Sequence, residues 1–337
     1  MTASERLRPV TRTDVAQRAG VSSAVVSYVV NSGPRNVAPE TRERVIQAIQ
    51  DLGYHPNAIA RALKRGVSDT IGLVIPDITN SYYSEYSHAI EDAAAERGLS
   101  VIFTNSVLGG IRERDVVATM MRRGIDGLLL ASARDVPELD AVRAAGMSLV
   151  VLERSQPVPG NASVGSNYRE ASRIAVEHLI AHGHRSIGLV TGYRGTTTTD
   201  REDGWRDALV AAGLEPGPIF WTSFTRDGGF NAGARMVRLR ERPTAVYVIS
   251  DLQAIGFLNA VHGSGLTIPG DVAVVSFDGS TESEFSWPPL TVMRQPVRDM
   301  AHAAVDLLVN PDPPSPAHYS FDSQLVIRTS CGCKLRP

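Results

Sequence analysis

Apolar residues near the amino terminus recur at the spacing of two short helices. Val15 and Ala19 lie four residues apart, and Val26, Val29 and Val30 follow at i, i+3 and i+4. Residues at these spacings lie on one face of an α-helix. The pattern therefore predicts two helices that each turn a narrow apolar stripe toward a shared core.

Polar residues and a glycine mark where these helices begin and end. Thr11 stands three residues before Asp14, which is the spacing of a capping box, and Ser22 is placed to cap the second helix. Gly20 supplies the turn between them. Residues 11–31 thus have the outline of a helix-turn-helix, whose second helix lies in the major groove of DNA. The outward-facing candidates for reading base edges are Ser23, Ala24, Ser27 and Tyr28.

A third helix and the charge distribution favour DNA binding over the alternative, an ordinary helical hairpin. Val45, Ile49 and Leu52 form one stripe that Gly53 ends, which completes a three-helix headpiece. Residues 1–66 carry ten basic against five acidic side chains, whereas the rest of the chain carries 24 basic against 31 acidic ones. A basic head indicates a polyanionic partner, because Lys and Arg that neutralise phosphates release counterions.

The remaining chain alternates apolar segments of strand length with segments of helix length. This alternation predicts parallel strands buried beneath helices. Two consecutive series of such units predict two doubly wound α/β subdomains, with a ligand expected in the crevice at the carboxyl ends of their strands. The expected strands are TIGLVIP, SVIFTN, DGLLLAS and MSLVVLE in the first series and SIGLVTG, PIFWTS, TAVYVIS and DVAVVSFD in the second.

Eight short motifs occur in an order that resembles the LacI/GalR family of bacterial transcription regulators. They occupy residues 14–16, 19–22, 26–27, 30–31, 41–45, 53–57, 60–63 and 71–77. The resemblance implies a DNA-binding headpiece at 1–56, a hinge helix or linker at 57–66, and an effector-binding and dimerisation body at 67–337. It also implies that Leu63 is pushed between base pairs in the minor groove, where contacts made by the bent DNA offset the cost of unstacking.

The resemblance extends the candidate DNA-binding residues to the helix caps and the hinge. The recognition positions Ser23, Ala24 and Tyr28 lack the long bidentate side chains that read adenine or guanine most sharply, so no operator sequence is predicted. The full set is Thr11, Ser22, Ser23, Ala24, Ser27, Tyr28, Asn31, Asn57, Ala60, Arg61, Leu63 and Lys64.

The body is expected to have the periplasmic-binding-protein architecture that this family carries. In that architecture the chain crosses between two subdomains three times, so both are discontinuous. We expect a first subdomain at about 67–161 and 294–318 and a second at about 162–293 and 319–337. The helix at 295–309 then returns to the first subdomain, and the strand SQLVIRTS ends in the second.

Polar and aromatic residues gather where the expected strands end, as an effector pocket requires. By resemblance, Arg201 and Asp278 match an arginine and an aspartate that hold the effector. Charged groups beside an aromatic wall suit a sugar or sugar derivative; a nucleobase or nucleoside is the alternative. For Asp251 we favour a helix N-cap over effector binding, because it opens DLQAIGFLNAV directly after a strand. The candidate effector-binding residues are Tyr82, Tyr83, Asn105, Ser132, Glu153, Thr197, Arg201, Phe224, Ser250, Asp251 and Asp278.

The signatures of common enzyme classes are missing from the sequence, which contains no GxGxxG, GxxxxGK[ST], HExxH or GxSxG. We therefore expect no enzymatic activity and no cofactor. His178, His182 and His184 are the one metal-like grouping, but no acidic or Cys ligand flanks them at a compelling spacing, so we expect a structural role and no metal. Cys331 and Cys333 are too close together for a disulfide framework.

The sequence as a whole predicts a homodimeric repressor whose affinity for double-stranded operator DNA is controlled by a small-molecule effector. By resemblance, the helices at 84–98 and 111–122 form the dimer surfaces. A cytoplasmic location is expected, because there is no apolar signal-peptide core and no eighteen-residue apolar run. The alternative is a sugar-binding protein of periplasmic type without DNA function, which needs a signal peptide and no DNA-binding head.

Overall fold

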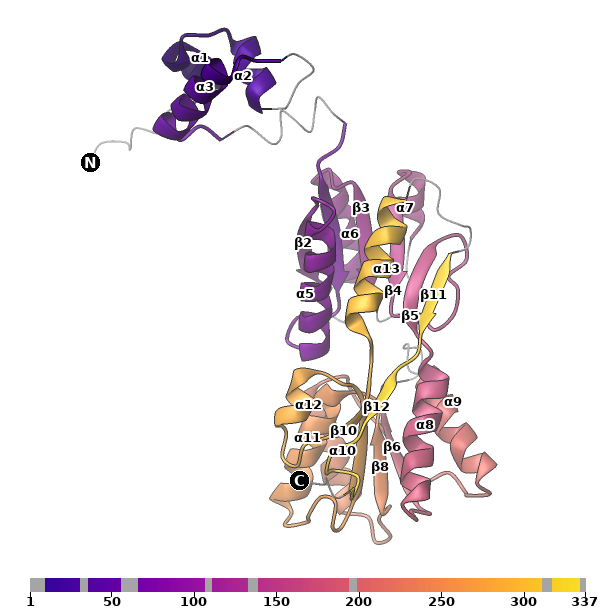
Figure 1. The fold of residues 1–337 in the computed structure, drawn as a ribbon. Coiled ribbons are helices and arrows are strands. Elements are labelled where there is room, and N and C mark those ends of the chain that lie inside the picture. Colours follow the sequence, from indigo (N-terminus) through magenta and orange to yellow (C-terminus); the bar gives the residue numbers. More distant parts are fainter. Residues whose placement is uncertain are drawn as a thin grey trace, which may run out of the picture. The chain divides into compact units, whose positions relative to one another are not determined.

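The computed structural model describes residues 10–30, 36–55, 66–106, 111–132, 139–193, 199–310 and 317–333. The chain divides into two compact units, Met1–Ser68 and Asp69–Pro337, here called the head and the body (Figure 1). The expected hinge helix lies outside the described residues. So do the candidate residues Asn31, Asn57, Ala60, Arg61, Leu63, Lys64 and Thr197.

The head consists of three short helices around a small apolar core. They are α1 (Arg12–Ala19), α2 (Ser23–Val30) and α3 (Pro39–Leu52). The predicted capping box is present, because the Thr11 hydroxyl accepts from the Asp14 backbone N–H while the Asp14 carboxylate accepts from the Thr11 N–H at 2.7 Å. Val15, Val26 and Val45 are fully buried and lie at the centre of the core. The helix-turn-helix pattern thus folds around the apolar positions that predicted it.

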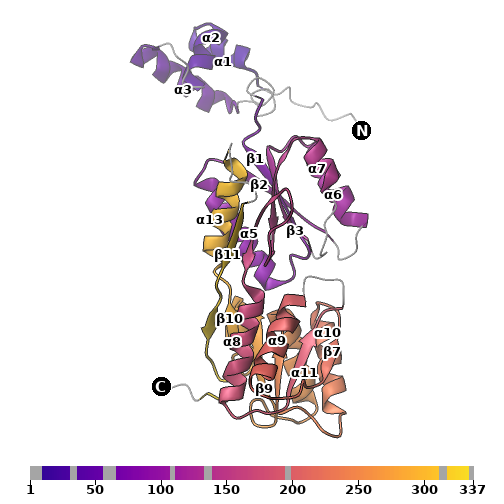
Figure 2. The same ribbon diagram turned by 90° about the vertical axis from the view of Figure 1, so that its right-hand side faces the viewer.

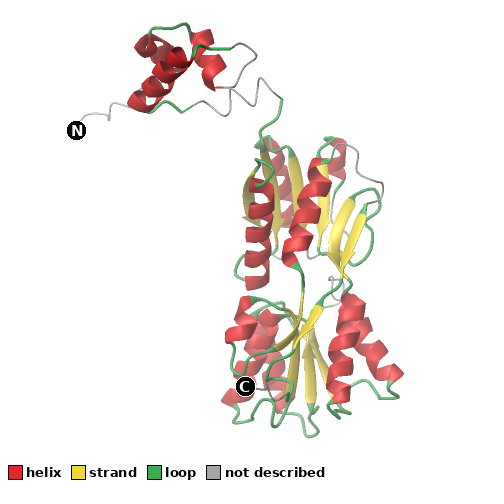
Figure 3. Ribbon diagram, in the orientation of Figure 1, coloured by secondary structure: helices red, strands yellow, loops and turns green. Residues whose placement is uncertain are grey.

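The first half of the body is a six-stranded sheet with helices on both faces (Figure 3). Its elements are β1 (Thr70–Ile75), α5 (Ser81–Ala95), β2 (Ser100–Asn105), α6 (Ile111–Arg122), β3 (Gly127–Ala131), α7 (Asp140–Ala144), β4 (Ser148–Leu152), β5 (Ala162–Ser166), α13 (Val297–Val309) and β11 (His318–Phe321). All neighbouring strands are parallel, in the order β11-β5-β4-β3-β1-β2. Helices α5 and α13 pack on one face, and α6 and α7 pack on the other.

The second half is a similar six-stranded sheet. Its elements are α8 (Tyr168–Ala181), β6 (Ile187–Thr191), α9 (Thr199–Ala211), β7 (Ile219–Trp221), α10 (Arg226–Val237), β8 (Ala245–Val248), α11 (Asp251–Gly263), β9 (Ala273–Asp278), α12 (Thr281–Phe285), β10 (Thr291–Arg294) and β12 (Gln324–Val326). The strand order is β12-β10-β9-β8-β6-β7, and β12 alone runs antiparallel to its neighbour. Helices α8 and α9 cover one face, and α10 and α11 the other. The predicted pair of doubly wound sheets is confirmed.

Three connections join the two halves: β5 to α8, β10 to α13, and β11 to β12 (Figure 1). Helix α13 packs against α5 in the first half, while β12 pairs with β10 in the second. Strand β5 belongs to the first sheet, so this sheet extends past the boundary that we placed at residue 161. Its sequence ASVGS has no long apolar run, which is why the pattern of apolar residues did not reveal it.

Among the described helices, none combines the length and apolarity that a membrane crossing requires.

Candidate functional site

A cavity of about 230 Å³ lies between the two halves of the body, at the carboxyl ends of their strands. This is the place where ligands bind in doubly wound sheets. The cavity draws residues from loops after β1, β4, β6, β7 and β9. Six of the eleven candidate effector-binding residues line it: Tyr82, Tyr83, Glu153, Arg201, Phe224 and Asp278.

Glu153 is a buried carboxylate that joins the two halves. Its Oε1 accepts a hydrogen bond of 2.5 Å from the Tyr82 hydroxyl, and its Oε2 accepts one of 2.8 Å from the Tyr168 hydroxyl. Tyr82 lies on α5 of the first half, whereas Tyr168 begins α8 of the second. Burial raises the pKa of Glu153, while the hydrogen bond from Tyr82 and the charge of Arg201 act in the opposite direction. Both Glu153 oxygens are therefore engaged within the protein.

A glycine allows the chain to pass close to Glu153. A Cβ atom at Gly165 of β5 would lie 2.1 Å from the backbone oxygen of Arg154. Real Cβ atoms do not approach a backbone atom this closely, so the residue after Glu153 can sit against β5 only if position 165 lacks a side chain. Gly165 thus allows the loop that carries the Glu153 carboxylate to pass directly against β5.

Arg201 is buried in α9 with its guanidinium between two aromatic rings. Its Cζ lies 4.2 Å from the centre of the Tyr168 ring and 4.6 Å from the centre of the Phe277 ring. Cation–π contacts of this kind hold the charge without using its N–H donors. Its Nε makes no hydrogen bond with any described residue, although the side chain is only 6% exposed. The Arg201 side chain thus lines the cavity and holds at least one buried donor without a partner among the described residues.

Asp278 ends β9 and presents a second buried carboxyl to the cavity. Its Oδ1 accepts a hydrogen bond of 3.2 Å from the Gln295 side-chain amide, whose oxygen accepts one of 2.8 Å from Ser166 on β5. Burial raises the pKa of Asp278 well above its ordinary value. The positive charge of Arg201 opposes this rise, whereas the charge of Glu153 adds to it. The protonated form of Asp278 is therefore unusually favoured.

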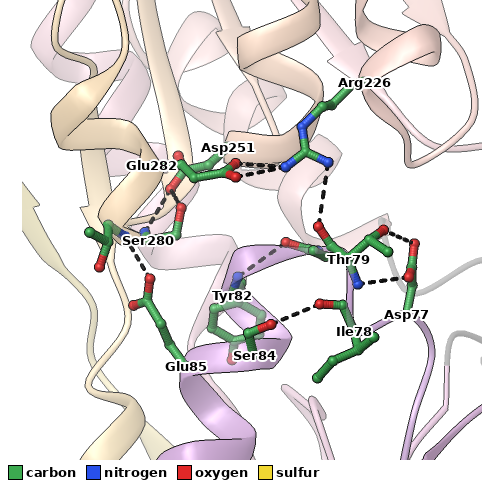
Figure 4. Close-up of polar contacts among 12 residues, drawn as sticks. Asp77, Ile78, Thr79, Tyr82, Ser84, Glu85, Arg226, Asp251, Ser280 and Glu282 are labelled. Carbon is green, nitrogen blue, oxygen red and sulfur yellow. Dashed lines mark hydrogen bonds and ion pairs between the residues drawn. The ribbon is translucent and has the colours of Figure 1, made fainter.

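A set of polar contacts crosses between the halves beside the cavity (Figure 4). Arg226 of α10 donates to both carboxylate oxygens of Glu282 on α12, at 2.7 and 2.9 Å, and to the Thr79 carbonyl before α5 at 3.4 Å. The backbone N–H of Thr281 donates to Glu85 of α5 at 2.7 Å. We call these the latch contacts. They join the start of α5 in the first half to α10 and α12 in the second.

Two candidate residues of the first half have structural partners and do not line the cavity. The side-chain oxygen of Asn105 accepts from the Ile78 backbone N–H at 3.1 Å, which shapes the loop after β1. The Ser132 hydroxyl donates to the buried carboxylate of Glu113 at 3.0 Å. Asn105 ends β2 and Ser132 follows β3, but their side chains hold neighbouring loops.

Two candidate residues of the second half support the start of α11 and likewise lie outside the cavity lining. Ser250 is the N-cap, and its hydroxyl accepts from the Gln253 backbone N–H at 3.3 Å. Asp251 is the first helical residue and not the N-cap. Its carboxylate accepts from the hydroxyl of Ser276 and from the backbone N–H and hydroxyl of Ser280. These contacts fix the turn after β9, which carries Asp278.

Several cavity residues were not anticipated from the sequence. Tyr168 and Tyr193 add aromatic surface, Leu252 adds an aliphatic contact, and Asp77 and Thr222 add polar groups. Tyr168 lies two residues after the end of β5, so recognition of that strand would have placed it among the candidates. Asp77 lies within the 71–77 motif and follows β1 just as the other candidates follow their strands.

The second helix of the head presents the predicted recognition residues at its surface. Ser22 and Ala24 are exposed, and Ser23, Ser27 and Tyr28 are partly exposed. On the opposite face Val26 and Val29 are buried and Val30 is partly buried. The Ser22 hydroxyl accepts from the Val25 backbone N–H at 3.4 Å, in keeping with a capping role.

Comparison with family models and known proteins agrees with these features. Residues 11–57 match the model described as bacterial regulatory proteins of the lacI family, and residues 176–331 match that of a periplasmic binding protein-like domain. Catabolite control protein A of Priestia megaterium is 34% identical over 307 residues, covering 89% of this chain and 91% of that protein. The transcriptional repressor PurR of Pasteurella multocida is 31% identical over 330 residues, covering 96% and 98%.

Among solved structures, the chain is similar to a Lac repressor dimer bound to operator and the anti-inducer ONPF. The TM-score is 0.85 at 29% identity, and the match covers 96% of this chain and 99% of that one. The match of residues 11–57 removes the alternative of a sugar-binding protein without DNA function. The relatives are regulators of transcription and not enzymes. The chain belongs to the LacI family and is a DNA-binding transcriptional repressor with an effector-binding domain.

Proposed function

We propose that the effector is a sugar or sugar derivative bound in the cavity between the two halves of the body. The observation that carries this proposal is Arg201, whose buried Nε–H has no partner among the described residues and whose side chain lines the cavity. A buried donor without a partner costs about 1–3 kcal/mol, and more when it is charged. A ligand hydroxyl recovers this free energy by accepting the hydrogen bond.

The other cavity groups complete a site for a hydroxyl-bearing ring. Asp278 supplies a carboxyl opposite Arg201, and Tyr83 and Phe224 supply apolar surface against which a ring packs. The cavity of about 230 Å³ lies below the range of about 300–1,000 Å³ that is usual for drug-sized ligands. We therefore favour a single sugar ring over an oligosaccharide.

A nucleobase is the second candidate, and one observation favours it. The raised pKa of Asp278 favours a neutral carboxyl group, which offers one donor and one acceptor side by side. That pattern complements the edge of a base. A sugar hydroxyl, in contrast, is satisfied equally by the ionised carboxylate.

Effector binding is coupled to the arrangement of the two halves. Tyr82 and Tyr168 reach Glu153 from opposite halves, and the latch contacts cross beside the cavity. A ligand shifts an equilibrium between arrangements only by its differential affinity for them. A ligand that contacts both Tyr83 of the first half and Arg201 of the second stabilises the closed arrangement.

The repressor acts as a homodimer on a pseudo-palindromic operator, with Leu63 of each hinge inserted at its centre. Strand β2 is an edge of the first sheet, and its Phe103 is 56% exposed. An exposed apolar side chain on an edge strand is a liability that a partner subunit covers. This edge lies beside α6, one of the two helices expected to form the dimer surface.

A thermal-shift panel of monosaccharides, sugar phosphates and nucleobases tests the effector assignment. A true effector stabilises the folded protein by about 2.7 kcal/mol at one hundred times its Kd. Phe224→Ala is expected to weaken the shift, whereas Phe285→Ala, a change at an exposed phenylalanine away from the cavity, leaves it unchanged. A shift that is the same in the parent and in Phe224→Ala contradicts the site. A shift with nucleobases alone contradicts the sugar.

Footprinting of the full-length protein on genomic fragments tests the operator model. Leu63→Ala is expected to weaken specific binding while leaving non-specific, salt-dependent binding in place, because phosphate contacts carry the latter. Unchanged specific affinity contradicts the insertion of Leu63.

Phe103→Glu is expected to convert the dimer to a monomer in analytical ultracentrifugation, and a persistent dimer contradicts the β2 interface.

A further inference from the structure

Two histidines and two cysteines meet at the far end of α8, in the second half of the body. His178 lies in the last turn of α8, and His182 is its C-cap. Cys331 and Cys333 flank Gly332 in the segment that follows β12. One ligating atom from each of the four residues lies within 4.8 Å of the corresponding atoms of the other three. In Figure 2 this end of α8 lies close to where the described chain finishes.

Three of the six distances among these four atoms are close to those of a tetrahedral metal site, and all six lie within 4.8 Å. His178 Nε2 lies 3.3 Å from the Cys331 sulfur and 3.8 Å from the Cys333 sulfur. His182 Nε2 lies 3.1 Å from the Cys333 sulfur. Zinc bonds of about 2.3 Å to sulfur and about 2.0 Å to nitrogen, at tetrahedral angles, place the ligand atoms about 3.3–3.8 Å apart. A zinc ion therefore needs only small side-chain adjustments to enter.

The local backbone brings the four side chains together. Histidines four residues apart lie on one face of a helix end. Gly332 has φ of 92°, a left-handed conformation that glycine adopts without strain and that turns the chain between the two cysteines. The third histidine of the sequence grouping, His184, lies apart from the cluster and contacts the Thr244 hydroxyl at 3.0 Å.

A hydrogen-bond chain supports a thiolate at Cys331. The Thr291 hydroxyl accepts from the Arg328 backbone N–H at 2.8 Å. Its own proton is therefore free to be donated to the Cys331 sulfur, which lies 3.0 Å away. Donors of this kind orient and stabilise a sulfur ligand from outside the metal's own coordination shell. Cys331 is itself buried, as a structural ligand usually is.

We propose that His178, His182, Cys331 and Cys333 bind one Zn²⁺ ion as a structural site. Two thiolates and two imidazoles suit zinc by ligand softness and geometry, and four protein ligands leave no open position for catalysis. Binding releases two thiol protons to solvent, so the two positive charges of the ion are balanced by two thiolates. The ion ties the segment after β12 to the end of α8, whose first residue, Tyr168, lines the effector cavity.

The sequence alone favoured no metal, because no cysteine stands near the histidines along the chain. The fold supplies the missing ligands by bringing residues about 150 positions apart into contact. The alternative for the cluster is a metal-free network of thiol–imidazole hydrogen bonds. The ratio of zinc to protein distinguishes the two possibilities, because only the metal site retains zinc in a fixed ratio to the chain.

The test uses the full-length protein, purified in reducing buffer without a histidine tag, incubated with ZnCl₂ and desalted. Elemental analysis is expected to find one zinc per chain, and Co²⁺ in its place to give the intense visible bands of a tetrahedral thiolate site. Cys333→Ser and His182→Ala are expected to lower the zinc affinity at least about tenfold. His184→Ala, a matched change two residues away, is expected to retain it.

The control measurements keep a folding defect separate from metal loss. Circular dichroism and operator binding are expected to be unchanged in Cys333→Ser, because Cys333 is only partly buried beside the apolar core of the second half and serine is close to it in size. Zinc is expected to raise the Tm of the parent and of His184→Ala, but not of Cys333→Ser. A parent protein that desalts free of zinc overturns the proposal. So does a folded Cys333→Ser that retains zinc as tightly as the parent.

Discussion

The Arg201 guanidinium lies 4.2 Å from the centre of the Tyr168 ring, and the hydroxyl of that same ring donates to Glu153. Glu153 in turn accepts from Tyr82 in the other half of the body. One aromatic ring thus links the buried cation of the cavity to the carboxylate that joins the halves. A ligand that binds Arg201 in the cavity therefore also acts on this junction through Tyr168.

Arg201→Ala is expected to abolish the stabilisation that the effector gives, because it removes both the donors and the stacked cation. Arg201→Lys is expected to keep part of it, since it retains the charge but not the planar group. The matched control is Arg206→Ala on the same helix, where the side chain is exposed and pairs with Glu202. A thermal-shift titration of the three variants checks this, and an Arg201→Ala protein that responds like the parent contradicts it.

Asp278→Asn is expected to raise the Tm at neutral pH by a few degrees, since 1 kcal/mol corresponds to about 2–4 °C in a domain of this size. The folded-state pKa of Asp278 lies above its ordinary value of 3.8. The stability it contributes is therefore greatest below that value and is lost as the pH rises through the folded-state pKa. Asparagine keeps the acceptor for Gln295 and tolerates the positive φ of 104°.

Melting curves over about pH 5 to 8 check the Asp278 prediction. The gain in Tm is expected to grow with pH. At the higher pH the Asp278 carboxyl of the parent protein is ionised while buried, which destabilises the parent but not the variant. Parallel curves for the two proteins contradict a raised pKa at this position.

Glu85→Ala is expected to weaken effector binding about fivefold, because it removes one latch contact worth about 1 kcal/mol. Its carboxylate accepts from the Thr281 backbone across the two halves. Glu91→Ala is the control, since Glu91 lies exposed on the same helix, 3.9 Å from His88. Isothermal titration calorimetry measures both. Equal affinities for the two variants show that the latch contributes nothing to closure.

Gly165→Ala is expected to destabilise the body by about 1–3 kcal/mol, as overpacking does elsewhere. The new methyl group meets the Arg154 backbone oxygen at 2.1 Å. Gly263→Ala is the control, because a Cβ there meets no atom within 4 Å and the backbone has no positive φ. Denaturant unfolding measures the difference, and similar midpoints for the two variants contradict the close approach.

The sequence predicted those parts of the fold that rest on local pattern. The head followed from valine spacing and the Thr11 capping box, and the strands of both sheets with long apolar runs were found in order. Strand β5 was missed because Ser163, Gly165 and Ser166 give it no apolar signature. Its place is set by parallel pairing with β4 and β11, which are contacts between distant parts of the chain.

The cavity was predicted in position but only partly in composition. Strand ends indicate which residues lie near the crevice, whereas the family resemblance singled out Arg201 and Asp278, and both of these residues line the cavity. Orientation is decided by neighbours that the sequence does not reveal. Asp251 and Asn105 also follow strands, yet hydroxyls and backbone amides bind their side chains elsewhere. The cluster of histidines and cysteines was the least predictable part. Its two histidines and its two cysteines are far apart along the chain and come together only in the folded structure.

The three connections between the halves of the body constrain any motion that a ligand drives. Because each half is assembled from separate stretches of chain, neither can be produced alone by cutting the gene at one point. A single proteolytic nick in one connection leaves the halves tethered by the other two. The three connections consequently restrict how far the two halves can move relative to each other.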